Sequence, residues 1–154
     1  MDATGLPLFY VHGNHDLIYK EKPPLGCDSI DGKIVKFKDL TIMGLGGSIW
    51  YNGKGFQYTE AQMRRRIRKI LRPFFIKRKI EKVDIIVTHS PPFGIHDDTD
   101  RAHIGFKAFI DLIRELKPRY FLHGHVQPRS YGDRITEFEG TKIINVFGHF
   151  RVEV

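Results

Sequence analysis

The chain has 154 residues, is 41% hydrophobic and carries a formal net charge of +7. This length and composition exclude a disordered or fibrous protein and predict one globular domain, residues 1–154, with a hydrophobic core. The single cysteine, Cys27, excludes an intramolecular disulfide framework; since no secretion signal or membrane-length apolar run is present, we expect a cytoplasmic protein without a membrane span.

Apolar runs of strand length, each bounded by turn residues, predict the strands. In chain order they cover residues 8–12, 33–37, 40–45, 83–88, 119–123, 135–138, 142–146 and 151–154. Hairpin turns are expected at residues 38–39 and 139–141. The segments 17–32, 46–58 and 90–104 are long and rich in Gly, Pro and Asp. Loops of this length in a compact domain are more often functional than idle.

Two amphipathic helices are expected, at residues 59–79 and 106–116. Thr59 and Gln62 have the spacing of a capping box at the start of the first helix, and Pro73 is expected to bend or break it. Its apolar residues fall on one side at helical spacing: Met63, Ile67, Ile70, Leu71 and Phe74.

The positive charge is concentrated in and after this first helix. Residues 59–82 contain ten basic residues against Glu60 and Glu81, a local balance of +8. Two interpretations remain open: a solvent-exposed outer face of a helix packed on a sheet, or a surface that binds nucleic acid, an anionic membrane or an acidic partner. Because no exposed aromatic residues alternate with the basic ones, the pattern is only weak support for nucleic acid.

Polar residues with the chemistry of metal ligands follow three of the predicted strands. Gly13-Asn14-His15-Asp16 comes after residues 8–12, His89 after residues 83–88, and His123-Gly124-His125 at the end of residues 119–123. Ligand sites in open α/β sheets lie outside strand ends, and metal ligands require rigid placement. The pattern therefore predicts a metal site, and it suggests phosphate ester chemistry.

These motifs resemble those of the calcineurin-like metallophosphoesterases. Gly13-Asn14-His15-Asp16 is similar to the family's GNHD motif, His89 to its isolated histidine ligand, and Gly124-His125-Val126-Gln127 to its Gly-His-x-His motif. The resemblance implies a mixed α/β (α+β) fold, a β-sandwich flanked by helices, here lacking its N-terminal strands. It also implies hydrolysis of phosphomonoesters or phosphodiesters by a metal-bound hydroxide.

The resemblance assigns roles residue by residue. It makes Asn14, His89 and His125 metal ligands, His15 the proton donor to the leaving group, and Asp16 the carboxylate that orients the His15 ring. Gly13 would permit a tight turn at the motif.

The last motif departs from the family pattern at its final position. Gln127 stands where the family has a histidine and would be a weak ligand. In an alternative register His123 and His125 are the two ligands; otherwise His123 is a buried strand residue.

The family's Asp-x-His and Gly-Asp motifs, which supply the carboxylate that bridges two metal ions, are not found in this sequence. Asp97, Asp98 and Asp100 are instead expected to be solvated or substrate-loop carboxylates. We therefore expect an N-terminally truncated form that holds at most one divalent ion (Mn, Fe, Zn, Ni or Mg) where a complete site holds two. Its activity alone would be impaired or absent.

Two further interpretations remain open. The chain could act as a non-enzymatic binding or scaffold module, which could bind nucleic acid through residues 59–82. Alternatively, a homo-oligomer or a complementing N-terminal segment supplies the missing carboxylates. In the loop 46–58, Trp50, Tyr51 and Phe56 either line a base-binding face or pack on the core.

Overall fold

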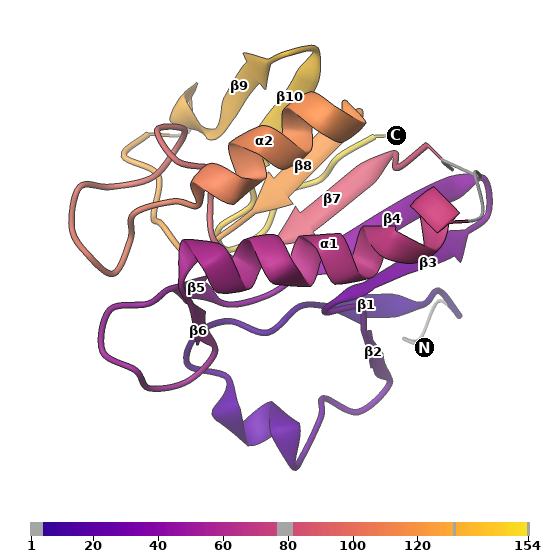
Figure 1. The fold of residues 1–154 in the computed structure, drawn as a ribbon, viewed down its shortest axis with the longest axis horizontal. Coiled ribbons are helices and arrows are strands. Elements are labelled where there is room, and N and C mark those ends of the chain that lie inside the picture. Colours follow the sequence, from indigo (N-terminus) through magenta and orange to yellow (C-terminus); the bar gives the residue numbers. More distant parts are fainter. Residues whose placement is uncertain (1–4, 77–81, 131, 154) are drawn as a thin grey trace.

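A six-stranded sheet with two helices on one face forms the body of the protein in the computed structural model (Figure 1). The structure describes residues 5–76, 82–130 and 132–153, with the side chains of residues 74–76 outside the description. The four inner strands are parallel, and β3 and β9 pair antiparallel at the two edges. In spatial order the strands are β3 (Lys33–Phe37), β4 (Leu40–Leu45), β7 (Ile85–Thr88), β8 (Tyr120–His123), β10 (Thr141–Asn145) and β9 (Ile135–Phe138).

Helices α1 (Glu60–Ile76) and α2 (Lys107–Leu116) bury their apolar sides against the sheet. The capping box at the start of α1 is present: the Gln62 N–H donates to Thr59 Oγ1 over 3.2 Å, and the Thr59 N–H donates to Gln62 Oε1 over 2.8 Å. The helix continues past Pro73 to Ile76, so of the two outcomes expected there, a bend or a break, the break was wrong. The core between helices and sheet includes Met43, Leu45, Met63, Ile86, Phe109, Phe121 and Ile143.

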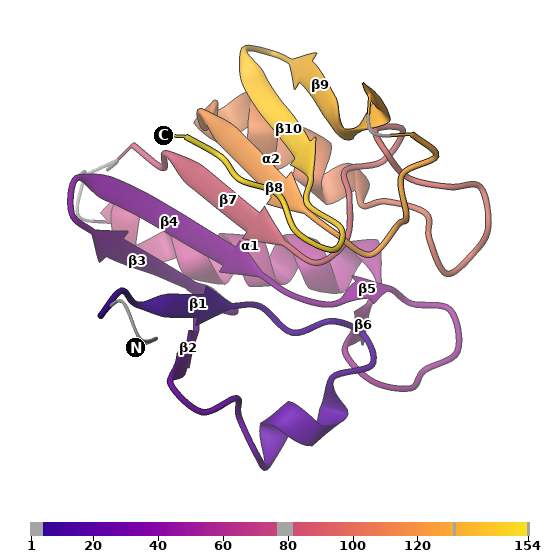
Figure 2. The same cartoon turned by 180° about the vertical axis from the view of Figure 1, so that it is seen from behind.

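The opposite face of the sheet, here called the second face, is covered differently. A separate two-stranded parallel sheet, β1 (Leu8–Tyr10) with β2 (Cys27–Ser29), lies against it, and Phe9 packs edge-on to Phe37. The C-terminal segment returns across the same face (Figure 2), where the Tyr120 hydroxyl donates to the Glu153 carbonyl over 3.1 Å. Several apolar side chains of this face remain only partly buried: Val35, Phe37, Leu40, Val87, Tyr120 and Leu122.

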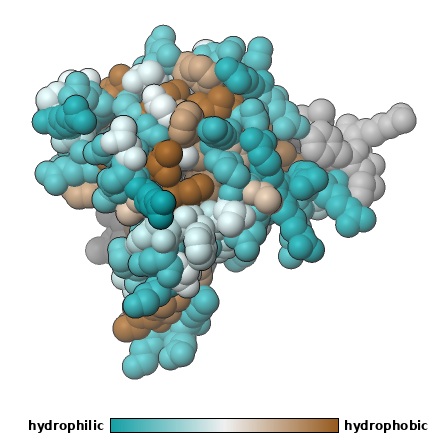
Figure 3. Space-filling view, turned by 60° about the vertical axis from the view of Figure 1, so that its left-hand side comes forward, coloured by the Kyte–Doolittle hydropathy of each residue, from teal (hydrophilic) through white to brown (hydrophobic). Residues whose placement is uncertain are grey.

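Short elements complete the fold. β5 (Ser48–Ile49) and β6 (Gln57–Tyr58) form a small parallel pair, and η1 (Leu17–Lys20) and η2 (Gly132–Arg134) are 3₁₀ turns. The projection at the bottom of Figure 1 carries η1, and Figure 3 shows apolar surface on it, where Leu17 and Ile18 are exposed.

The expected mixed α/β class is confirmed, and the strands at residues 33–37, 40–45 and 135–138 have the predicted bounds. Residues 151–153 form no strand, so that expectation was wrong; residue 154 and the expected helix end at 77–79 lie outside the described residues. The strands β2, β5 and β6 were not predicted, because two or three residues carry no periodic signal. None of the described helices has the length and apolarity that crossing a membrane requires.

Candidate functional site

The side chains of Asn14 and His89 meet at the C-terminal ends of β1 and β7. Asn14 Oδ1 lies 2.9 Å from His89 Nε2, although the two residues are 75 positions apart in the chain. Asn14 is only 3% exposed. The structure thus brings together two of the predicted ligands, but from two different sheets, since β1 pairs with β2 and not with β7.

The loop that carries Asn14 is closed by Asp16. The Gly13 N–H donates a hydrogen bond to Asp16 Oδ2 over 2.7 Å. Among the described residues, this is the one hydrogen bond that the Asp16 carboxylate accepts. A Cβ on Gly13 would lie 3.0 Å from both His89 Cε1 and Asp16 Oδ2. A side chain at position 13 would thus press on the His89 ring and on the Asp16 carboxylate, which favours glycine there. Gly13 is not among the residues with positive φ, so the expected need for a special turn conformation does not explain it. His15 is exposed at the tip of the loop.

The segment from Gly46 to Tyr58 wraps around this loop. Asn14 Nδ2 donates to the Tyr51 hydroxyl over 3.0 Å, which leaves Oδ1 directed at His89. Gly55, with φ +78°, approaches the Asn14 carbonyl so closely that a Cβ would lie 1.9 Å from that oxygen. Within the segment, Gln57 Oε1 accepts hydrogen bonds from the backbone N–H groups of residues 51, 52 and 53. Of its aromatic residues, Phe56 stacks on His12 and Trp50 is 56% exposed.

A part-buried ion pair between Arg66 and Asp31 holds this segment in place, and sequence reasoning missed it. Arg66 of α1 donates to both Asp31 oxygens, at 2.7 and 2.8 Å, and to the Gly46 carbonyl at 2.9 Å. The Gly47 N–H in turn donates to the His12 carbonyl, one residue before the motif. Only the bulk charge of α1 was visible in the sequence, and nothing in the local pattern identifies which of its arginines faces inward.

The remaining predicted ligands point to other partners. The His125 ring lies beside the His89 ring, with centroids 4.6 Å apart, but its Nε2 lies 2.7 Å from the Ala102 carbonyl. His123 is fully buried at the end of β8, and its Nε2 lies 3.0 Å from His96 Nδ1. Gln127 is exposed and lines a hollow of about 370 Å³ together with His96, Asp97 and Asp98.

The donor chemistry fits only the neutral half of a two-metal centre. Asn14, His89 and His125 bring no negative charge, and in the described part of the chain no three His, Cys, Asp or Glu side chains are grouped as metal ligands. Asp97, Asp98 and Asp100 accept hydrogen bonds from backbone N–H groups of their own loop. The residues present therefore do not by themselves fit the pair of cations, because two adjacent cations require a bridging anion.

Burial controls the protonation of the clustered histidines. It lowers the pKa of His89 to about 4, with the charges of His125 and His15 acting in the same direction. It lowers the pKa of His123 to about 3, and it lowers the pKa of His125 as well. All three rings are therefore neutral near pH 7, which is the form of imidazole that binds metal ions.

This shift predicts a loss of stability in weak acid for the metal-free chain. In the unfolded chain His89 takes up a proton at the ordinary histidine pKa of 6.5, whereas in the folded chain it does so only near pH 4. The contribution of neutral His89 to the free energy of unfolding is therefore fully present above about pH 6.5 and is lost as the pH falls toward 4. At about pH 5 the expected cost from His89 is on the order of 2 kcal/mol. Urea unfolding at pH 7 and pH 5 measures it. His89→Gln should lose less stability over this interval; an equal loss in both proteins would contradict the prediction.

The chain is similar to known proteins in both sequence and fold. A family model described as calcineurin-like phosphoesterase matches residues 1–129. One crystal structure is similar to this chain with a TM-score of 0.64 and 18% sequence identity, and the match covers 93% of this chain. The crystal structure of TT1561 of Thermus thermophilus is similar with a TM-score of 0.62 and 14% identity, and that match covers 92% of this chain. The chain spans 58% and 63% of the lengths of those two proteins, and these likenesses show the fold alone. No curated protein matches the chain.

Proposed function

Because the chain belongs to the calcineurin-like phosphoesterase family, we propose that it supplies the proton donor and the neutral ligands of a metal-dependent site that hydrolyses phosphate esters. The observation that carries the proposal is the contact of Asn14 Oδ1 with His89 Nε2 at 2.9 Å, directly beside the exposed His15. In this proposal Asn14, His89 and, after release from the Ala102 carbonyl, His125 face the metal side of the site. Gln127 and His123 are the weaker candidates, since one is exposed on a loop and the other is bonded to His96.

His15 acts on the substrate as a general acid in this proposal. It protonates the leaving oxygen while the phosphate ester is held at the strand ends, and this oxygen then departs as an alcohol instead of an alkoxide. The exposure of His15 supports the role, because the donor must reach a bound substrate. Asp16 supports it indirectly, because the hydrogen bond that its carboxylate accepts from the Gly13 N–H fixes the loop that carries His15.

The carboxylates of the site come, in this proposal, from residues outside the 154 of this chain. They belong to a complementing segment or to a second chain that covers the second face of the sheet. The partly buried Val35, Phe37, Val87 and Leu122 support this location, since side chains of this type gain free energy when water is excluded from them.

Metal uptake and turnover test the proposal. The 154-residue chain is compared with a chain extended by a segment that carries Asp-x-His and Gly-Asp motifs. We expect weak, single-ion manganese binding by calorimetry and little hydrolysis of bis(p-nitrophenyl) phosphate for the chain alone, and two ions with turnover for the extended chain. The proposal fails if the extended chain binds two ions without turnover, or if turnover survives replacement of both Asn14 and His89 by alanine.

A non-enzymatic binding module is the second candidate, favoured by the incomplete ligand set of the described residues. It predicts that the extended chain takes up no metal and hydrolyses no ester. The same measurements therefore separate the two functions.

A further inference from the structure

A hollow of about 510 Å³ lies where the edge strand β3 meets α1. We call it the edge hollow. Its lining comes from the start of β3 and from one side of the helix: Asp31, Gly32, Lys33, Ile34, Arg66, Lys69, Ile70 and Pro73. Neither Asn14 nor His89 lines the edge hollow, so it is a different place from the candidate metal site.

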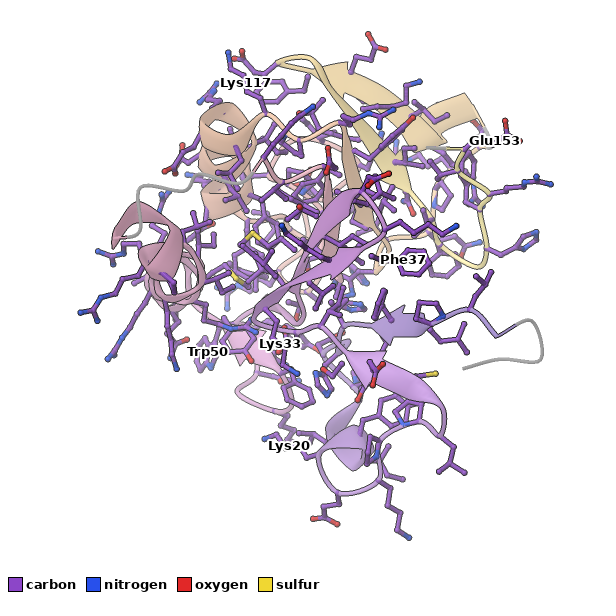
Figure 4. The ribbon with its side chains drawn as sticks, turned by 90° about the vertical axis from the view of Figure 1, so that its right-hand side faces the viewer. Lys20, Lys33, Phe37, Trp50, Lys117 and Glu153 are labelled. Atoms are coloured by element: carbon purple, nitrogen blue, oxygen red, sulfur yellow. The ribbon has the colours of Figure 1, made fainter. Side chains whose placement is uncertain are left out.

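The outer edge of β3 beside this hollow is open to another strand. In the described sheet β4 is the only strand neighbour of β3. Figure 4 shows this hairpin between α1 on the left and the β1–β2 pair below, with Lys33 and Phe37 labelled at the two ends of β3. Val35 pairs with Ile42, and Phe37 pairs with Leu40 across a two-residue turn. Because antiparallel pairing alternates, the backbone N–H and C=O of Ile34 point to the outer edge.

The edge hollow combines an apolar floor with a cationic rim. Ile34, Ile70 and Pro73 provide the floor, and Lys33 and Lys69 provide the rim. Its one carboxylate, Asp31, already accepts hydrogen bonds from Arg66 Nη2 on both of its oxygens, so it does not offset the lysines. The exposed Arg65 and Arg72 extend the positive surface along α1. Such a surface is complementary to negative charge carried on a partly apolar segment.

We propose that the edge of β3 and the edge hollow bind an acidic, strand-forming segment of a partner protein. The segment adds to the sheet next to β3 and exchanges backbone hydrogen bonds with Ile34. Alternate side chains of an added strand project to the side of α1. An apolar residue at these positions covers Ile70 and Pro73, and a carboxylate reaches Lys69 on the rim.

Two other occupants fit less well. A second copy of the chain, paired through its own β3, would bring Lys33, Lys36 and Lys38 against like charges, and lysines on an edge strand oppose such pairing. A nucleic acid strand would meet a floor of Ile34, Ile70 and Pro73, with no aromatic ring among the lining residues on which a base could stack.

Peptide binding tests the proposal on the intact 154-residue chain. The probe is a fluorescein-labelled Thr-Val-Thr-Glu-Thr-Glu-Thr peptide with blocked ends, measured by fluorescence anisotropy in about 0.15 M salt to limit nonspecific attraction. Two further peptides carry N-methyl groups on the odd or on the even residues. Since only alternate N–H groups of an added strand face β3, one of the two should lose at least about tenfold in affinity and the other should bind like the parent.

Charge reversal locates the site. Lys69→Glu should weaken binding about tenfold, whereas Lys22→Glu, an equal charge change at an exposed position outside the edge hollow, should not. Circular dichroism shows whether both variants keep the parent fold. The proposal is overturned if the parent peptide does not bind saturably, if both methylated peptides bind equally, or if both variants weaken binding equally. A single-stranded oligonucleotide that displaces the peptide from the parent protein, but not from the Lys69→Glu variant, would point to nucleic acid as the occupant of the edge hollow. That result would also overturn the proposal.

Discussion

Replacing Arg66 by methionine is expected to lower the free energy of unfolding by about 2–3 kcal/mol, because the part-buried Asp31 carboxylate loses the guanidinium and keeps only the Gly46 N–H among its described donors. The two side chains are 19% and 14% exposed, and the guanidinium also holds the Gly46 carbonyl. Methionine keeps much of the side-chain volume, so the lost charge and hydrogen bonds dominate the effect. Urea unfolding followed by Trp50 fluorescence measures the loss.

Arg65→Met is the matched control, since Arg65 is the exposed neighbour on the same helix and its replacement should cost less than about 0.5 kcal/mol. The double variant Arg66→Met with Asp31→Asn should recover part of the loss, because an amide is less costly to bury than an unpaired carboxylate. If Arg66→Met cost no more than Arg65→Met, the ion pair would not contribute to stability. Amide exchange at Gly47, whose N–H donates to the His12 carbonyl just before the motif, should accelerate in Arg66→Met.

Patterns of neighbouring residues predicted the β3–β4 hairpin, the start of α1 and the ends of two strands, because short-range interactions determine these features. The short strand-length runs at residues 33–37 and 40–45 and the turn at 38–39 predicted the β3–β4 hairpin, and Lys38 indeed has a positive φ of 53°. The Thr59 and Gln62 spacing located the start of α1 to within a residue. The placement of His89 and His123 at strand ends followed from the apolar runs before them.

Long-range contacts decided what the sequence could not predict. Tyr51 orients Asn14 from 37 positions away, and Arg66 reaches Asp31 across 35 positions. Neither contact has a period or a spacing that a single sequence displays. The continuation of α1 past Pro73 is also a tertiary effect, since the buried Ile67, Ile70 and Leu71 hold the helix against the sheet where local propensity favours a break.

In the site, the spacing of Gly124-His125-Val126-Gln127 indicated a pair of ligands, but the backbone separates them. His125 has a φ of 65°, and this left-handed residue turns the chain after β8 so that Gln127 lies away on an exposed loop. The roles of these residues as ligands stay a prediction, and what the structure adds is their surroundings. The three candidate ligands near His15 are neutral, and the aspartates of the 96–105 loop are engaged with their own backbone.

Replacing His15 by alanine is expected to lower kcat by about 10²- to 10⁴-fold in the metal-loaded, extended chain, because the leaving oxygen then departs without a proton. The effect should depend on the leaving group. A phosphodiester with an alkyl leaving group needs the proton and should show the full loss, whereas a 2,4-dinitrophenyl ester, whose phenolate is stable, should show little. Steady-state hydrolysis of both esters measures the difference.

His149→Ala is the matched control, since it removes an exposed histidine of the C-terminal segment and should leave both rates unchanged. A merely structural role of His15 would lower the two rates by the same factor, because misplacement of the substrate does not depend on the leaving group. Equal losses on the two esters would therefore refute the general-acid role, even if the variant were nearly inactive. A loss confined to the alkyl ester would assign the proton transfer to His15, since its imidazole is the group that the substitution removes from the tip of the Asn14 loop.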